Sequence, residues 1–171
     1  MQVFGNGSAM RVSSVGWLFN TPEQTNHVAK LTAEITHNHK EGIKGAQTIA
    51  SSIFLLRNGA TKNELKDYIE TTFNYNLSRI LDEIRPSYFH KESCQESVPE
   101  DIISFLEGAS YEDVIRNAIS LGGDSDTLAC MGGSNAESFY KIPESFKVKV
   151  NKIIPKEMKD VINKFYNIIN F

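Results

Sequence analysis

The stretch Leu121-Gly122-Gly123-Asp124-Ser125-Asp126-Thr127-Leu128 places two carboxylates and a hydroxyl within four residues, directly after a pair of glycines. Carboxylate and hydroxyl oxygens are hard ligands that suit Mg²⁺ or Mn²⁺. The glycines allow the backbone to turn sharply enough for both carboxylates to face one ion. The residues that follow predict a buried helix, whose N-terminal end would favour anionic groups at the same place.

The same stretch has a simpler interpretation. Asp124 or Ser125 can act as the N-cap of the following helix, with the other acid in its first turn. An Asp-x-Asp pattern alone does not separate a cap from a metal site, so the choice depends on the other motifs in the chain.

Length and composition predict one globular domain. The chain has 171 residues, of which 40% are hydrophobic and 23% charged, which is enough to bury a sizeable core. The net charge of -3 gives no reason to expect nucleic acid as a partner. The first residues show no secretory signal, and the apolar stretches are too short to span a membrane, so we expect no membrane partner. Cys94 and Cys130 form no C-x-x-C pair, and a reducing cytoplasm is the expected location.

Charge is distributed unevenly along the chain. The segment from Lys141 to Phe171 carries seven lysines and three acids, a net charge of +4 that leaves -7 for the remainder. A solvated helical face is the simplest explanation, and an acidic partner surface is the alternative.

Start and stop signals predict one helix after another, without strand-like alternation between turns. Thr21-Pro22-Glu23-Gln24 and Thr61-Lys62-Asn63-Glu64 are typical N-terminal capping sequences, and Ser110 is a further cap. A helix rich in small residues should run from about residue 41 to a stop at Gly59. The pattern predicts an all-α fold, a compact multi-helix bundle forming a single domain over residues 1–171.

Later segments complete the predicted bundle. Residues 82–98 are the least regular part and predict a long loop of the kind that often carries function. Pro99 should open the next helix, and another should follow the glycine turn to about Tyr140. Two basic helices are expected over 144–154 and 155–169.

Two further motifs carry polar residues. Gly5-Asn6-Gly7 allows close approach of the backbone to a phosphate or ribose, although Asn-Gly is also a common turn. Thr36-His37-Asn38-His39 precedes the small-residue helix. Its two histidines lack a third zinc ligand at suitable spacing, so a hydrogen bond to a phosphate or a backbone group is the favoured role.

Together the motifs resemble the ADP-ribosylglycohydrolase family. The resemblance is carried by Gly5 to Val12, by Thr36 to Ala46, and by Ser110 to Thr127, in the right order and at about the right spacing, and it is strongest over residues 3–140. It implies an all-α fold that binds two divalent cations, Mg²⁺ or Mn²⁺, at the bottom of a cleft. The substrate it implies is ADP-ribose on a protein or small molecule.

The resemblance also assigns roles. Asp124, Asp126 and Thr127 resemble metal ligands, with Asp126 as the carboxylate shared between the ions and both acids as catalytic residues. The loop Gly5, Asn6 and Gly7 resembles the segment that lies along the diphosphate and distal ribose of ADP-ribose. His37 resembles the histidine of the same ligand pocket that contacts the adenosine-diphosphate portion. Met10 and Arg11 are expected to support that loop.

The chain departs from the family pattern at its start. The family has a preceding segment with a Thr-Asp-Asp turn that supplies the other metal ligands, and no such turn occurs here. We therefore expect an N-terminally truncated, C-terminal portion of the enzyme, completed by another chain or by a homo-oligomer. The alternatives to a metal-dependent hydrolase are a non-catalytic ADP-ribose or nucleotide-binding module and a truncated helical interaction protein.

Overall fold

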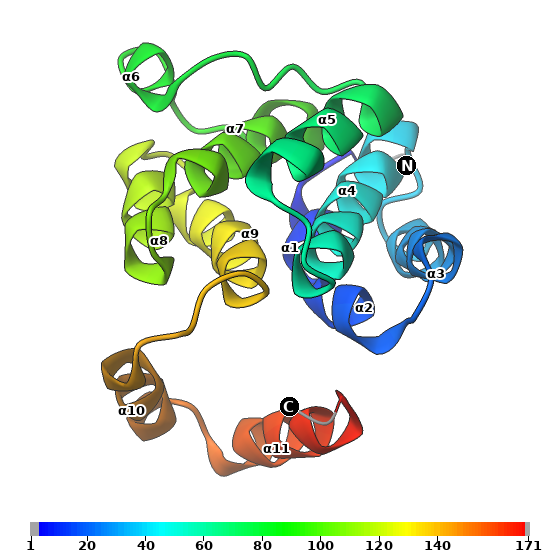
Figure 1. Ribbon diagram of the computed structural model, residues 1–171, viewed down its shortest axis with the longest axis vertical. Coiled ribbons are helices and arrows are strands. Elements are labelled where there is room, and N and C mark those ends of the chain that lie inside the picture. Colours follow the sequence, from blue (N-terminus) through cyan, green and yellow to red (C-terminus); the bar gives the residue numbers. More distant parts are fainter. Residues whose placement is uncertain (1–3, 170–171) are drawn as a thin grey trace.

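The computed structural model describes residues 4–169, and within this range it consists of α-helices without strands (Figure 1). The all-α prediction is confirmed. In chain order the helices are α1 (Gly7–Met10), α2 (Ser13–Leu18), α3 (Pro22–Glu34), α4 (Lys40–Arg57), α5 (Lys62–Phe73), α6 (Leu81–Ile84), α7 (Cys94–Glu107), α8 (Tyr111–Ser120), α9 (Ser125–Glu137), α10 (Glu144–Ile153) and α11 (Lys156–Ile169).

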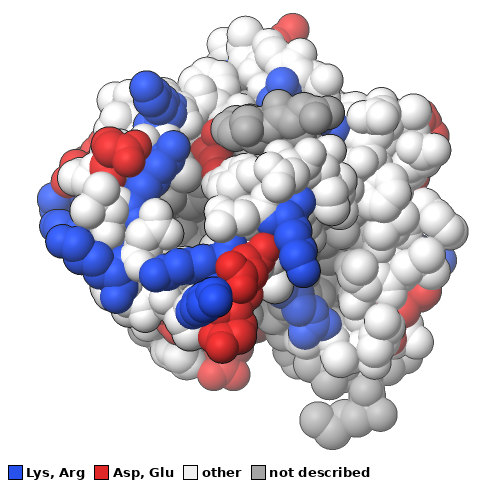
Figure 2. Space-filling model, turned by 90° about the horizontal axis from the view of Figure 1, so that it is seen from below, with Lys and Arg blue, Asp and Glu red and all other residues white. Residues whose placement is uncertain are grey.

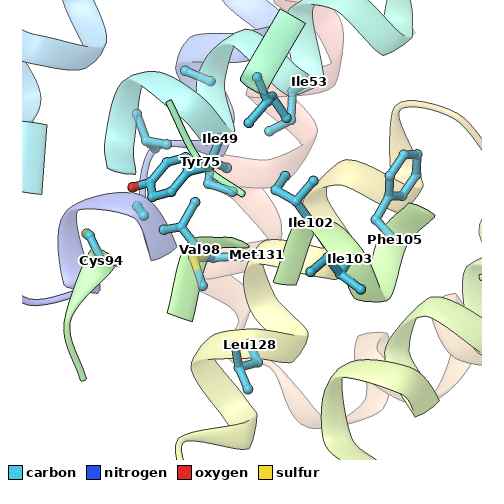
Figure 3. Packing of buried hydrophobic residues seen from close by; sticks show 14 of the residues in the cluster. Ile49, Ile53, Tyr75, Cys94, Val98, Ile102, Ile103, Phe105, Leu128 and Met131 are labelled. Carbon is cyan, nitrogen blue, oxygen red and sulfur yellow. The ribbon is translucent and has the colours of Figure 1, made fainter. Parts of the chain in front are cut away.

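Helix α4 lies at the centre of the bundle, where it contacts α1, α2, α3, α5, α7 and α9. Its isoleucines Ile49 and Ile53 are fully buried and pack with apolar residues of α7 and α9 (Figure 3). Burial of one such side chain stabilises a fold by about 1.5–3 kcal/mol. A Cβ atom on Gly45 would lie 2.4 Å from Cys94 Sγ, so the small residue here lets α7 begin against α4.

The capping sequences act as predicted. The Thr21 hydroxyl accepts a hydrogen bond from the Gln24 amide, and Thr61 and Glu64 form a reciprocal capping box. Ser110 caps α8 in the same way by accepting from the amide of Asp113. These helices begin within one residue of the expected positions because capping is determined by neighbouring residues.

The region around Pro99 differs from the prediction. Helix α7 begins at Cys94, and Pro99 lies inside it. A proline there removes one helical hydrogen bond, but Cys94, Val98 and Ile102 are fully buried along one face, and this burial offsets the loss. The short helices α1, α2 and α6 were also not predicted. Because α6 and the first residues of α7 fall within the expected loop at 82–98, its irregular part shrinks to residues 85–93.

The two C-terminal helices form where the sequence predicts them, over Glu144–Ile153 and Lys156–Ile169. Neither contains a buried residue. They lie beside the bundle rather than inside it, with α11 reaching the neighbourhood of α2 (Figure 1).

Candidate functional site

The acidic turn places Asp124 at the boundary of α9. Gly122 and Gly123 have φ angles of +74° and +62°, the left-handed conformation that glycine adopts without steric cost. Asp124 occupies the N-cap position of α9, but its side chain makes no capping hydrogen bond. Its Oδ2 instead accepts a hydrogen bond of 2.7 Å from Nδ2 of Asn6. Asp124 therefore occupies the position that the simple capping interpretation predicts, but its side chain does not cap the helix.

Asn6 belongs to the short segment that begins α1 and is 7% exposed. Its backbone amide donates to the carbonyl of Glu92 at 2.7 Å, which ties the segment to the loop before α7. A Cβ atom on Gly7 would lie 3.1 Å from His37 Nε2, so the imidazole lies directly against the α1 backbone. The three sequence motifs thus meet around α1.

The two histidines of the second motif have different roles. His37 Nδ1 lies 2.8 Å from the Thr36 hydroxyl and 3.4 Å from Arg11 Nη2. Partial burial, followed by the charge of Arg11, lowers the pKa of His37, so the neutral form dominates at neutral pH. His39 caps α4, with Nδ1 accepting from the amide of Glu41 at 3.2 Å, and this confirms a backbone partner for one of the pair.

Thr127 and Asp126 complete the acidic turn. Thr127 is 7% exposed, and its hydroxyl donates to Met10 Sδ at 3.6 Å, while the Cys130 thiol donates to the Met10 carbonyl at 3.5 Å. Met10 therefore joins α1 to the first turns of α9, whereas its expected role was to support the Gly5–Gly7 loop. Thioether sulfur is a weak acceptor, so this contact leaves the lone pairs of the hydroxyl oxygen available. Asp126 is exposed to solvent.

The donor set suits a hard cation that keeps several waters. It comprises two carboxylates and one hydroxyl on a single helical turn, all of them oxygen donors, as Mg²⁺ requires. No group of three or more His, Cys, Asp or Glu side chains within residues 4–169 is arranged to hold a metal. Within the described residues, the acidic turn is therefore not part of such a group.

His90 lies at the site although the sequence placed it only in a loop. A Cβ atom on Gly123 would lie 2.8 Å from His90 Cα, so the loop backbone rests on the glycine turn. His90 Nε2 and Glu92 Oε1 are 2.8 Å apart. This hydrogen bond, followed by the nearby charges of Glu92, Asp124 and Asp126, raises the pKa of His90. The sequence signal was only the irregular loop, because the contact with Gly123 depends on tertiary packing.

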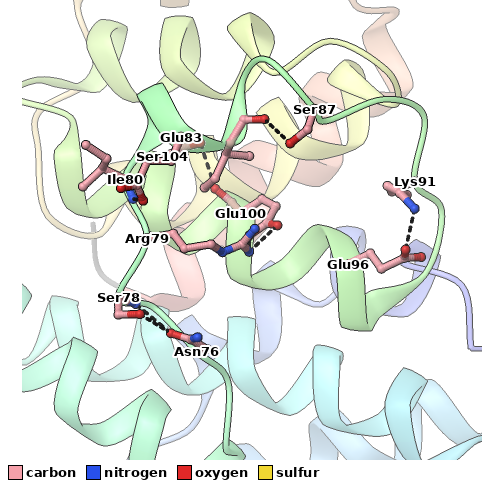
Figure 4. Close-up of polar contacts among 11 residues, drawn as sticks. Asn76, Ser78, Arg79, Ile80, Glu83, Ser87, Lys91, Glu96, Glu100 and Ser104 are labelled. Atoms are coloured by element: carbon pink, nitrogen blue, oxygen red, sulfur yellow. Dashed lines mark hydrogen bonds and ion pairs between the residues drawn. The ribbon is translucent and has the colours of Figure 1, made fainter.

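Ion pairs anchor the segment that leads to this loop (Figure 4). Arg79 Nη2 donates to both carboxylate oxygens of Glu100 on α7, at 2.6 and 2.8 Å. Burial raises the pKa of Glu100 although Arg79 opposes the shift. Lys91 Nζ pairs with Glu96 at 2.6 Å. These contacts hold the loop at the edge of the acidic turn.

The fold and the site define an all-α domain in which a glycine-asparagine segment and an acidic helix start form one polar centre. Residues 2–169 match the family model described as ADP-ribosylglycohydrolase. The chain belongs to the ADP-ribosylglycohydrolase family.

Curated relatives include the protein named ADP-ribosylhydrolase ARH3. The Homo sapiens protein is 26% identical over 192 residues, covering 84% of this chain and 53% of the relative. The Gallus gallus protein is 27% identical, with 84% and 52% covered. This chain thus spans about half the length of the curated relatives it matches.

A solved structure titled ADP-ribosylglycohydrolase-related protein complex supports the fold. It superposes with a TM-score of 0.67 at 22% sequence identity, and the match covers 81% of this chain and 50% of the solved chain.

In residues 4–169 of the present chain, every helix is too short or too polar to cross a bilayer.

Proposed function

We propose that this chain acts in the hydrolysis of ADP-ribosyl adducts, at the bond to C1 of the ribose. The observation that carries the proposal is the hydrogen bond from Asn6 Nδ2 to Asp124 Oδ2, which joins two motifs separated by 118 positions. Family membership supports the same reaction class, and two named relatives are ADP-ribosylhydrolases.

In this proposal each motif has one task. Asp124, Asp126 and Thr127 would hold Mg²⁺ or Mn²⁺, which supplies Lewis acidity and activated water when bound. Asn6 orients the Asp124 carboxylate by fixing Oδ2, which leaves Oδ1 for other partners. The α1 backbone and the neutral His37 ring would contact the diphosphate and ribose of the substrate. Negative charge at the start of α9 would favour an oxocarbenium-like transition state.

We also propose that further metal ligands come from outside the described residues. Two carboxylates and a hydroxyl can hold one Mg²⁺ with waters but are too few to fix two ions. We therefore propose that the isolated chain binds one divalent metal ion.

The test is calorimetric titration of the purified chain with ADP-ribose, with Mn²⁺ present and after chelation. We expect binding that weakens after chelation, and about tenfold weaker Mn²⁺ binding in Asp126→Asn, because one charged ligand becomes neutral. Asp67→Asn is the matched control, since Asp67 is exposed on α5. A parallel assay follows release of ADP-ribose from an ADP-ribosylated protein.

The other outcomes separate the alternatives. ADP-ribose binding of equal affinity before and after chelation would favour a non-catalytic nucleotide-binding module. If the isolated chain bound neither ADP-ribose nor Mn²⁺, both the hydrolase and the nucleotide-binding module would be contradicted. The remaining alternative would then be a helical interaction protein.

A further inference from the structure

The C-terminal helices border an open hollow that the proposed hydrolase site does not use. It has a volume of about 770 Å³ and lies between the end of α9 and the helices α10 and α11. This volume falls within the range of roughly 300–1,000 Å³ that is typical of small-molecule sites.

The lining of the hollow is mainly apolar and aromatic. Phe146 and Val150 project from successive turns of α10, and Ile162 lies opposite them on α11. Tyr111 and Phe139 form part of the wall on the side of the bundle. Val150 is still 49% exposed and Ile162 39% exposed, so these apolar faces are only partly covered by the protein itself.

The charged groups in the lining are mostly cationic. Lys141 and Lys147 are exposed there, and the one acid, Glu137, already accepts a hydrogen bond of 3.0 Å from the Tyr166 hydroxyl. Among residues 4–169, none of the seven lysines from position 141 to 164 forms an ion pair. Figure 2, which views the molecule from below Figure 1, shows lysine and arginine side chains gathered on one part of the surface, with acidic side chains among them.

We infer that the hollow binds one long-chain carboxylate, with the acyl chain against the apolar lining and the carboxylate at Lys141 and Lys147. The apolar walls match an alkyl chain, and the exposed lysines of the lining are cationic partners for a carboxylate. This site would be separate from the acidic turn, and the inference does not depend on the proposed hydrolase activity.

Two other occupants fit less well. A symmetric contact with a second copy through this face would bring two lysine-rich surfaces together, and like charges repel. A flat anionic membrane could contact the lysines, but it would not fill the space in which α10 and α11 face Tyr111 and Phe139.

The experiment is calorimetric titration of the full chain with oleate below its micelle concentration, beside the neutral oleyl alcohol. We expect saturable binding of one oleate per chain, and alcohol binding weaker by about tenfold because it lacks the charge. Lys147→Glu should weaken oleate binding by about tenfold or more, since it reverses a charge in the lining. Lys149→Glu makes the same change on the same helix at a residue outside the lining, and it should have a much smaller effect.

A second variant tests the apolar wall. Val150→Asp should abolish oleate binding, while circular dichroism reports whether the helices remain formed. Equal losses in Lys147→Glu and Lys149→Glu would overturn the inference, as would absence of oleate binding to the folded wild-type chain. Binding to phosphatidylserine vesicles without binding to monomeric oleate would assign the face to a membrane, and dimerisation that buries it without oleate would assign it to a second copy.

Discussion

The side chains of Asn6 and Asp124 form a hydrogen bond of 2.7 Å between the start of α1 and the start of α9. Asn6 is nearly buried, and Asp124 is partly buried. The carboxylate is therefore held by a neutral donor from a distant part of the chain rather than by the amides of its own helix. This leaves the N-terminal amides of α9 available to solvent or ligand.

Removal of the Asn6 side chain should affect both stability and metal binding. Asn6→Ala leaves the Asp124 carboxylate without its donor, and we expect a loss of about 2 kcal/mol in the free energy of unfolding. Urea denaturation measures this loss, and Mn²⁺ titration should show weaker binding because the carboxylate is no longer oriented. Asn38→Ala is the control at an exposed asparagine. Equal effects of the two variants would contradict the structural role of Asn6.

The glycine pair provides a second comparison. Both residues have positive φ angles, so alanine at either position should cost about 1–2 kcal/mol. A Cβ atom on Gly122 would meet nothing within 4 Å, whereas one on Gly123 would lie 2.8 Å from His90 Cα. Gly123→Ala should therefore cost about 1–3 kcal/mol more than Gly122→Ala, because the loop carrying His90 must move. Denaturant midpoints of the two variants measure the difference, and equal midpoints would show that the loop does not rest on this turn.

The buried Asp101 should make stability depend on pH. Burial raises the pKa of Asp101 well above its ordinary value, although a hydrogen bond from Asn135 opposes the shift. Asn135 Nδ2 donates to Asp101 Oδ2 at 3.4 Å, whereas Asp101 Oδ1 and Asn135 Oδ1 have no hydrogen-bond partner among the described residues. The native state then binds more protons than the unfolded state between the two pKa values, so this residue makes stability fall as pH rises through that window.

Asp101→Asn should remove this pH-dependent contribution. The amide is neutral at every pH and adds a donor among the unpaired acceptors, so the variant should be more stable than wild type at pH 8 and gain less at pH 4. Urea denaturation at several pH values tests this, with Asp67→Asn as the exposed control. A variant that is less stable than wild type at pH 8 would mean that the ionised carboxylate stabilises the fold.

Local signals and tertiary contacts were not equally predictable. The caps at Thr21, Thr61 and Ser110 were predicted because each depends on residues three positions away. The start of α7 was missed because a proline is a strong local signal for a helix start, while the burial that extends the helix back to Cys94 comes from α4. No local pattern could reveal the His90–Gly123 contact.

The neutral state of His37 provides the last prediction. Partial burial and then the Arg11 charge lower the pKa of His37, so the native state holds fewer protons than the unfolded state just below pH 6.5. Stability should therefore rise with pH through this window. Arg11→Gln removes the cation and should raise the pKa of His37, which NMR titration of the imidazole measures directly. Arg11→Lys keeps the positive charge and should keep the pKa low. A rise of the same size in both variants would show that the geometry of the guanidinium, and not its charge, controls the protonation of His37.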